Sequence, residues 1–164
     1  MNNIFPKHPR ILAIATSRRG FGYAVVEGQK ILVDWGTTPI AADKNVGSIQ
    51  KVEEMIALYQ PQVMVLEDTA TKGSRRSTRI QTLTKQLIAL AESRGIEVEL
   101  FSQKQVRRAF FADERGTKHA LAEIIAGEFP EELGFRLPPK RLAWMSEDSR
   151  MDIFDAVALA LMVR

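Results

Sequence analysis

Two aspartates near the end of the chain, Asp152 and Asp155, have the spacing best suited to chemistry. Side chains three positions apart lie on one face of a helix, so the two carboxylates would lie side by side. Residues 156–161 are all apolar and predict that the rest of this helix is buried. A buried helix seldom carries adjacent acids unless a cation lies beside them, and Mg²⁺ prefers such oxygen ligands. The alternative is that these acids only stabilise a helix start through its dipole.

The composition excludes several other kinds of chemistry. The 164 residues contain no cysteine and two histidines, so disulfides, thiolate catalysis and typical zinc sites are not expected. The length predicts a single domain over residues 1–164. We find no run of 18 apolar residues and no apolar segment after the first charges, which predicts a cytoplasmic protein without a membrane span or signal peptide.

Positive charge is concentrated in the middle of the chain. The net charge is +3, but residues 72–119 hold eleven Lys and Arg against five Asp and Glu. A basic region beside an acidic cluster favours a nucleic-acid-binding surface next to a metal site, and the alternative is a solvated helix face. The candidate nucleic-acid contacts are Arg18, Arg19, Lys72, Arg75, Arg76, Arg79, Lys104, Arg107, Arg108, Lys140 and Arg141.

The segment 72–79 is the densest part of this basic region. Its four cations precede a predicted helix, where positive charge opposes the helix dipole. Local stability does not explain them, which favours a phosphate partner over a flexible solvated loop.

Residues 130–150 predict a long connection without regular structure, which in a compact domain is often functional. The connection contains two adjacent prolines, a basic pair and Trp144. Two interpretations of Trp144 stay open: it stacks on a base, or it anchors the connection to the core.

Hydrophobic patterning predicts an α/β fold. The predicted strands cover residues 11–15, 23–27, 30–35, 63–67 and 96–101, with turns at 16–22 and at Gly28-Gln29. The predicted helices cover 48–59, 80–91, 102–110, 117–129 and a final helix from 152. Right-handed crossovers then give a mixed five-stranded sheet, a three-stranded antiparallel meander plus parallel strands, with helices on both faces.

This order resembles the ribonuclease-H-like superfamily, and within it the RuvC-type Holliday junction resolvases. Residues 11–23 resemble the first hairpin of that family, 65–67 its second acidic motif, 105–118 its basic segment and 152–161 its terminal acidic helix. The likeness spans nearly the whole chain, and the terminal helix is its most specific part.

The resemblance implies a divalent-metal-dependent, structure-specific endonuclease that hydrolyses branched DNA such as Holliday junctions, with Mg²⁺ or Mn²⁺ as cofactor. It carries over Glu67, Asp152 and Asp155 as catalytic, metal-binding carboxylates. It also carries over Lys118 as a catalytic residue that holds the scissile phosphate. The resemblance further implies a homodimer, which no pattern in the sequence tests.

The chain departs from the family at Ala15, where the resemblance calls for an aspartate on the first strand. The departure predicts an impaired or altered active site. Asp68 is the candidate metal ligand that replaces the missing acid: alternation along a strand turns it away, unless the strand ends at Glu67. The alternative function is a catalytically inactive DNA- or RNA-binding module of the same fold. An actin-like or sugar-kinase ATPase is disfavoured, because the chain is short for two lobes.

Overall fold

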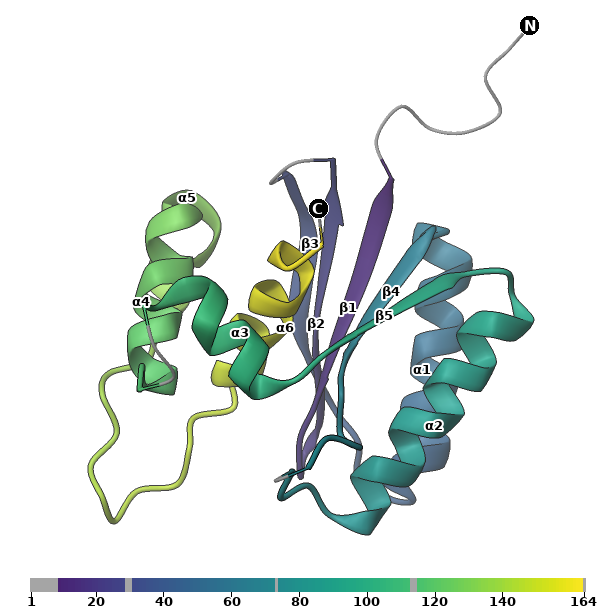
Figure 1. The fold of residues 1–164 in the computed structure, drawn as a ribbon, viewed down its shortest axis with the longest axis horizontal. Helices are drawn as coiled ribbons and strands as arrows, with labels where there is room; N and C mark the ends of the chain where they lie inside the picture. The colour runs from purple at the N-terminus through teal and green to yellow at the C-terminus, as the bar shows by residue number, and fades with distance from the viewer. Residues whose placement is uncertain (1–8, 29–30, 73, 113–114, 164) are drawn as a thin grey trace, which may run out of the picture.

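The computed structural model describes residues 9–28, 31–72, 74–112 and 115–163, so Gln29 of the turn predicted at Gly28-Gln29 lies outside the described residues. Within these ranges one sheet contains five strands, in the order β3-β2-β1-β4-β5 (Figure 1). The strands are β1 (Arg10–Thr16), β2 (Gly20–Glu27), β3 (Ile31–Pro39), β4 (Val63–Glu67) and β5 (Glu97–Phe101). β1, β2 and β3 form an antiparallel meander, whereas β4 runs parallel to β1 and β5. The predicted mixed sheet is therefore confirmed.

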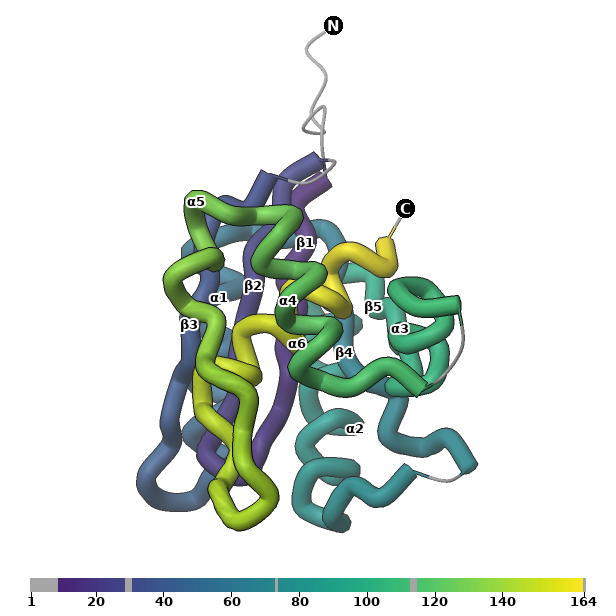
Figure 2. Tube along the Cα trace, turned by 90° about the vertical axis from the view of Figure 1, so that its left-hand side faces the viewer, coloured from purple at the N-terminus to yellow at the C-terminus, as the bar shows by residue number. Residues whose placement is uncertain are grey.

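Helices cover both faces of this sheet, as predicted (Figures 1 and 2). α1 (Lys44–Tyr59) and α2 (Thr78–Ser93) pack on one face. α4 (Lys118–Glu128) and α6 (Met151–Leu161) pack on the other, and α6 lies against β1 and β2. The remaining helices are α3 (Gln103–Phe110), α5 (Pro130–Leu133) and the short 3₁₀ helix η1 (Gly134–Arg136). Among the described residues, no helix is long and apolar enough to cross a membrane.

Local sequence explains where several helices begin. Ser102 and Gln105 form both hydrogen bonds of a capping box at the start of α3. Ser77 caps α2 and Thr117 caps α4 through their hydroxyl oxygens. α1 begins earlier than predicted, because the Asp43 carboxylate accepts a hydrogen bond from the Val46 backbone at 3.3 Å.

Two predictions about irregular segments are wrong. Gly22 lies within β2, paired with Ala15 and Thr37, rather than in a turn. Residues 130–136 are helical, because Pro130 supplies a favourable first helical residue for α5. Only residues 137–150 form the irregular connection that we expected for the whole stretch.

Alternation along two strands determines which residues reach the α6 side of the sheet. Ala13 and Ala15 of β1 and Val65 of β4 belong to the core formed with α4 and α6, whereas Leu12 and Leu66 face α1 and α2. Since β1 and β4 are parallel neighbours, they end at the same edge of the sheet.

Candidate functional site

A pocket lies where β1 and β4 end, and it brings together three of the four predicted catalytic residues. Ala15 and Glu67 line it from the strands, Lys118 from α4 and Asp155 from α6. The rest of the lining is polar as well as apolar: Thr16, Arg76, Gln103, Arg107, Phe101, Val106, Leu121, Ala158 and Leu159. The position opposite Glu67 on β1 is therefore a methyl group rather than a carboxylate.

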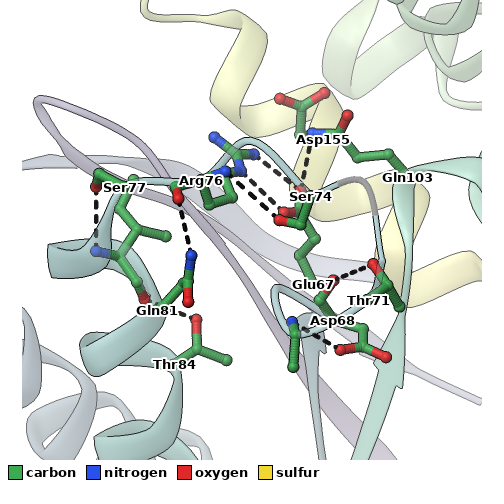
Figure 3. Close-up of polar contacts among 12 residues, drawn as sticks. Glu67, Asp68, Thr71, Ser74, Arg76, Ser77, Gln81, Thr84, Gln103 and Asp155 are labelled. Atoms are coloured by element: carbon green, nitrogen blue, oxygen red, sulfur yellow. Dashed lines mark hydrogen bonds and ion pairs between the residues drawn. The ribbon is translucent and has the colours of Figure 1, made fainter.

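Glu67 is held by donors of the chain itself (Figure 3). Arg76 donates from Nε to Oε2 and from Nη2 to Oε1, both at 2.8 Å, and Gln103 Nε2 donates to Oε1 at 3.0 Å. The Glu67 side chain is 14% exposed, so little of it faces water. The hydrogen bonds to Glu67 raise the pKa of Arg76 above its ordinary value. A two-pronged pair of this kind is among the stronger charge-assisted contacts in proteins.

The backbone around Arg76 fixes the direction of its side chain. The side-chain amide of Gln81 donates to the Arg76 backbone carbonyl at 3.0 Å. The backbone N–H of Arg76 donates to the Ser74 hydroxyl at 3.4 Å. The next residue, Ser77, is the N-cap of α2. The guanidinium thus reaches Glu67 from a segment tied to the start of a helix.

Asp155 faces a second cation, Lys118. The Lys118 ammonium lies 3.4 Å from Asp155 Oδ2 and 3.1 Å from Glu147 Oε1. Burial raises the pKa of Asp155 to about 6, with Glu147 and Asp152 adding to the effect and Lys118 opposing it. Burial also disfavours the charge of Lys118, but the carboxylates of Asp155 and Glu147 outweigh it and raise its pKa.

Asp152 lies one turn earlier on α6, against the first hairpin. Its Oδ2 accepts a hydrogen bond from Ser17 Oγ at 2.8 Å, and burial raises its pKa. Gly22 permits this close approach, because a Cβ at that position would lie 2.3 Å from the Asp152 carbonyl oxygen. The missing side chain of Gly22 therefore lets α6 pack its acidic end onto β2.

Glu147 is a member of this site that the sequence analysis did not identify. It lies near the end of the irregular connection, where its carboxylate binds Lys118 and its carbonyl accepts a hydrogen bond from Arg19. The only signal in the sequence is an acid a few residues before the acidic helix. Its contact with Lys118, 29 positions away, depends on tertiary structure.

The donor set does not fit the pair of divalent metal ions that the resemblance implies. Ala15 supplies no oxygen, and both oxygens of Glu67 are bonded to Arg76. Asp68 is not among the residues that line the pocket, and its Oδ1 accepts a hydrogen bond from the Ala70 backbone at 3.1 Å within its own loop. Over the ranges that the structure describes, no group of three or more His, Cys, Asp and Glu side chains is arranged to hold a metal ion.

The predicted basic residues divide into half-buried side chains and exposed cations. Arg79 is half-buried and donates to the Asn45 side chain at 3.0 Å and to the Ser17 carbonyl at 3.1 Å. Arg107 lines the pocket and Arg76 binds Glu67. The exposed basic residues are Arg18, Arg19, Lys72, Arg75, Lys104, Arg108, Lys140 and Arg141.

Solved structures of Holliday junction resolvases share this fold. RuvC of Thermus thermophilus superposes with a TM-score of 0.66 at 16% identity, over 93% of this chain and 91% of that chain. The same protein in complex with a Holliday junction substrate gives 0.68 at 16% identity, over 94% and 92%. The yeast mitochondrial Holliday junction resolvase Ydc2 gives 0.61 at 19% identity, over 98% and 79%. No protein-family profile and no curated protein sequence matches the chain. The chain therefore has the ribonuclease-H-like fold of the RuvC resolvases.

Proposed function

We propose that the chain binds branched DNA through a resolvase fold and does not cleave it by metal-dependent hydrolysis. The observation that carries this proposal is the pairing of Glu67 with Arg76 at 2.8 Å through both carboxylate oxygens. In a resolvase of the implied kind, that carboxylate is free to bind metal.

The charge of the remaining acids supports the same conclusion. Lys118 lies between Asp155 and Glu147. Its ammonium group balances the negative charge of these carboxylates, which divalent metal ions would balance in a metal site. Ala15 also removes the strand acid that the resemblance implies for this position. The pocket lies where the resemblance places a nuclease centre, but lysine and arginine side chains neutralise its carboxylates.

Exposed cations support nucleic-acid binding. Lys72 and Arg75 lie after β4, Arg18 lies in the turn between β1 and β2, and all three are exposed. Both segments adjoin the edge of the sheet that holds the pocket (Figures 1 and 2). The RuvC of similar fold that was solved with a Holliday junction substrate makes branched DNA the partner to test first. A homodimer, which would present this edge twice to a symmetric junction, belongs to the same proposal.

The competing function is a Mg²⁺- or Mn²⁺-dependent endonuclease with an altered centre. It is favoured by one specific observation, the gathering of Glu67 and Asp155 in a single pocket with Asp152 one helical turn away. That arrangement is what a resolvase centre would retain.

Binding and cleavage of a labelled four-way junction, with linear duplex as control, test the proposal. We expect the unmodified chain to bind the junction more tightly than duplex and to leave it intact in Mg²⁺ and in Mn²⁺. Affinity should fall steeply with salt, and a Lys72→Ala/Arg75→Ala variant should reduce the slope of log affinity against log salt by about 1 to 2. Lys51→Ala, an exposed cation on α1, is the matched control and should leave the slope unchanged.

Cleavage by the unmodified chain would establish the competing endonuclease instead. Absence of any preference for the junction over duplex would contradict the proposed partner.

A further inference from the structure

The connection between η1 and α6, residues 137–150, exposes large apolar side chains. Trp144 is 81% exposed and Leu142 is 56% exposed. The interpretation of Trp144 as a core anchor is therefore wrong. Leaving an indole in water forgoes the free energy that its burial would supply, so stability of the isolated chain does not explain its position.

Trp144 is displayed by a defined turn rather than by a loose loop. The Met145 amide donates to the Leu142 carbonyl at 3.0 Å, which makes Ala143 and Trp144 the central pair of a β-turn. Arg141 Nη1 donates to the Met145 carbonyl at 3.1 Å and closes the turn from the other side. We call residues 141–145 the Trp144 turn. A side chain at the corner of such a turn points away from the chain that carries it.

The Trp144 turn is attached to the candidate site. Three residues after Trp144, Glu147 binds Lys118 through its carboxylate, and Arg19 donates to the Glu147 carbonyl. Lys118 in turn contacts Asp155 in the pocket. In Figures 1 and 2 the connection reaches the end of the molecule at which β1 and β4 finish. The connection that carries Trp144 thus lies at the same end of the molecule as the pocket, where Glu147 contacts Arg19 and Lys118.

Two cations lie close to Trp144 in the sequence. Lys140 precedes the Trp144 turn and Arg141 begins it, both are exposed, and no acidic residue occurs between 137 and 146. An aromatic ring beside cations is the arrangement with which proteins bind unpaired nucleic acid, because the ring stacks on a base while the cations bind the phosphates. Branched DNA supplies unpaired or easily unstacked bases where its helices meet.

We propose that Trp144 stacks on an unpaired base of the bound nucleic acid, and that the contact between Glu147 and Lys118 positions its turn. This inference rests on the proposed function and names a residue that recognises the branch. A protein or membrane surface would also cover an exposed tryptophan. The attachment to the basic end of the sheet favours nucleic acid.

Tryptophan fluorescence tests the stacking directly. The chain has two tryptophans, and Trp35 is partly buried against the core, so Trp35→Phe leaves Trp144 as the sole emitter. We expect titration with a single-stranded thymidine oligonucleotide to quench this emission. An oligonucleotide of equal length without bases should not quench it, because it offers phosphates but no stacking surface.

Affinity measurements complete the test. Trp144→Ala should weaken binding of the single strand and of the four-way junction by about tenfold, and Trp144→Phe should restore most of that loss. Phe135→Ala is the matched control, because Phe135 is 71% exposed but belongs to η1, outside the turn. It should bind as the unmodified chain does.

The outcomes separate the inference from the function on which it rests. Junction binding that persists unchanged in Trp144→Ala, without quenching, would overturn the stacking role and leave the proposed function standing. Failure of the unmodified chain to bind either nucleic acid would overturn both. A blue shift of the Trp144 emission on addition of anionic phospholipid vesicles, with no response to the oligonucleotide, would assign Trp144 to a membrane surface instead.

Discussion

The guanidinium of Arg76 binds both oxygens of the Glu67 carboxylate, at 2.8 Å each, beside the pocket that holds Asp155. Glu67 ends β4, and Arg76 lies nine residues later in the segment that leads into α2. The pair links the sheet to the loop and neutralises the strand carboxylate. The contact between Arg76 and Glu67 therefore both fixes the loop after β4 and sets the net charge of the pocket.

Arg76→Ala should destabilise the fold, because it leaves the largely buried Glu67 carboxylate without its main partner. We expect a loss of about 1 to 3 kcal/mol, which for a chain of this size lowers the melting temperature by roughly 2–10 °C. Thermal unfolding followed by circular dichroism measures the change. Arg75→Ala removes an exposed neighbour and should shift stability by less than about 0.5 kcal/mol. Equal effects of the two variants would show that the Arg76 pair contributes nothing to stability.

Restoring a strand acid alone should not create a metal site. In Ala15→Asp the new carboxylate lines the pocket, but Arg76 still holds both oxygens of Glu67. We expect Ala15→Asp/Arg76→Ala to bind Mn²⁺ about tenfold or more tightly than Ala15→Asp, since it frees a second carboxylate. Titration calorimetry with Mn²⁺ measures both affinities, and Ala15→Asp/Arg75→Ala controls for the lost charge. Tight Mn²⁺ binding by Ala15→Asp alone would mean that Arg76 yields readily to a metal.

Asp155 should make stability fall as pH rises through the weakly acidic range. Its pKa in the folded chain is about 6, against roughly 3.9 for an unfolded aspartate. Between these values the folded state holds a proton that the unfolded state has released, so the contribution is full below pH 4 and lost above pH 6. The raised pKa corresponds to about 2 to 3 kcal/mol.

Urea unfolding at pH 4.5 and 7.5 measures this dependence. Asp155→Asn should remove most of that fall, because the amide does not titrate. Asp148→Asn is the control: hydrogen bonds to Arg150 lower the pKa of Asp148 to about 2, below the tested window. A fall in stability that persists in Asp155→Asn would assign it to another group.

The fold could be predicted from the sequence because its signals are local. β1 and β4 are continuous apolar runs, and both are buried at the centre of the sheet. The bonds of Ser102 and Gln105 span three residues and follow from the capping box alone. Alternation along the strand likewise predicts that Glu67 and Val65 share a face.

The charge balance of the site could not be predicted in the same way. Arg76 was interpreted as a phosphate contact, since a loop cation gives no sign that it will turn back toward Glu67. Glu147 contacts Lys118 across 29 positions of the chain, and α4, α5 and the connection lie between the two residues. The contact therefore depends on how these elements pack. Gly22 was placed in a turn because glycine is common there, whereas its role is to admit the backbone of Asp152.

Gly22→Ala should disturb the acidic end of α6 more than any other part of the fold. The added methyl would lie 2.3 Å from the Asp152 carbonyl oxygen, so the helix or the strand must move. We expect a loss of about 1 to 3 kcal/mol or more in urea unfolding. Gly127→Ala is the matched control of opposite sign: its methyl meets nothing within 4 Å in α4, and alanine should stabilise the helix by about 0.5 to 1 kcal/mol. The displacement should also lengthen the hydrogen bond between Ser17 and Asp152, now 2.8 Å, which a crystal structure of the variant would reveal. A Gly22→Ala chain as stable as the unmodified one would mean that α6 does not depend on this close approach.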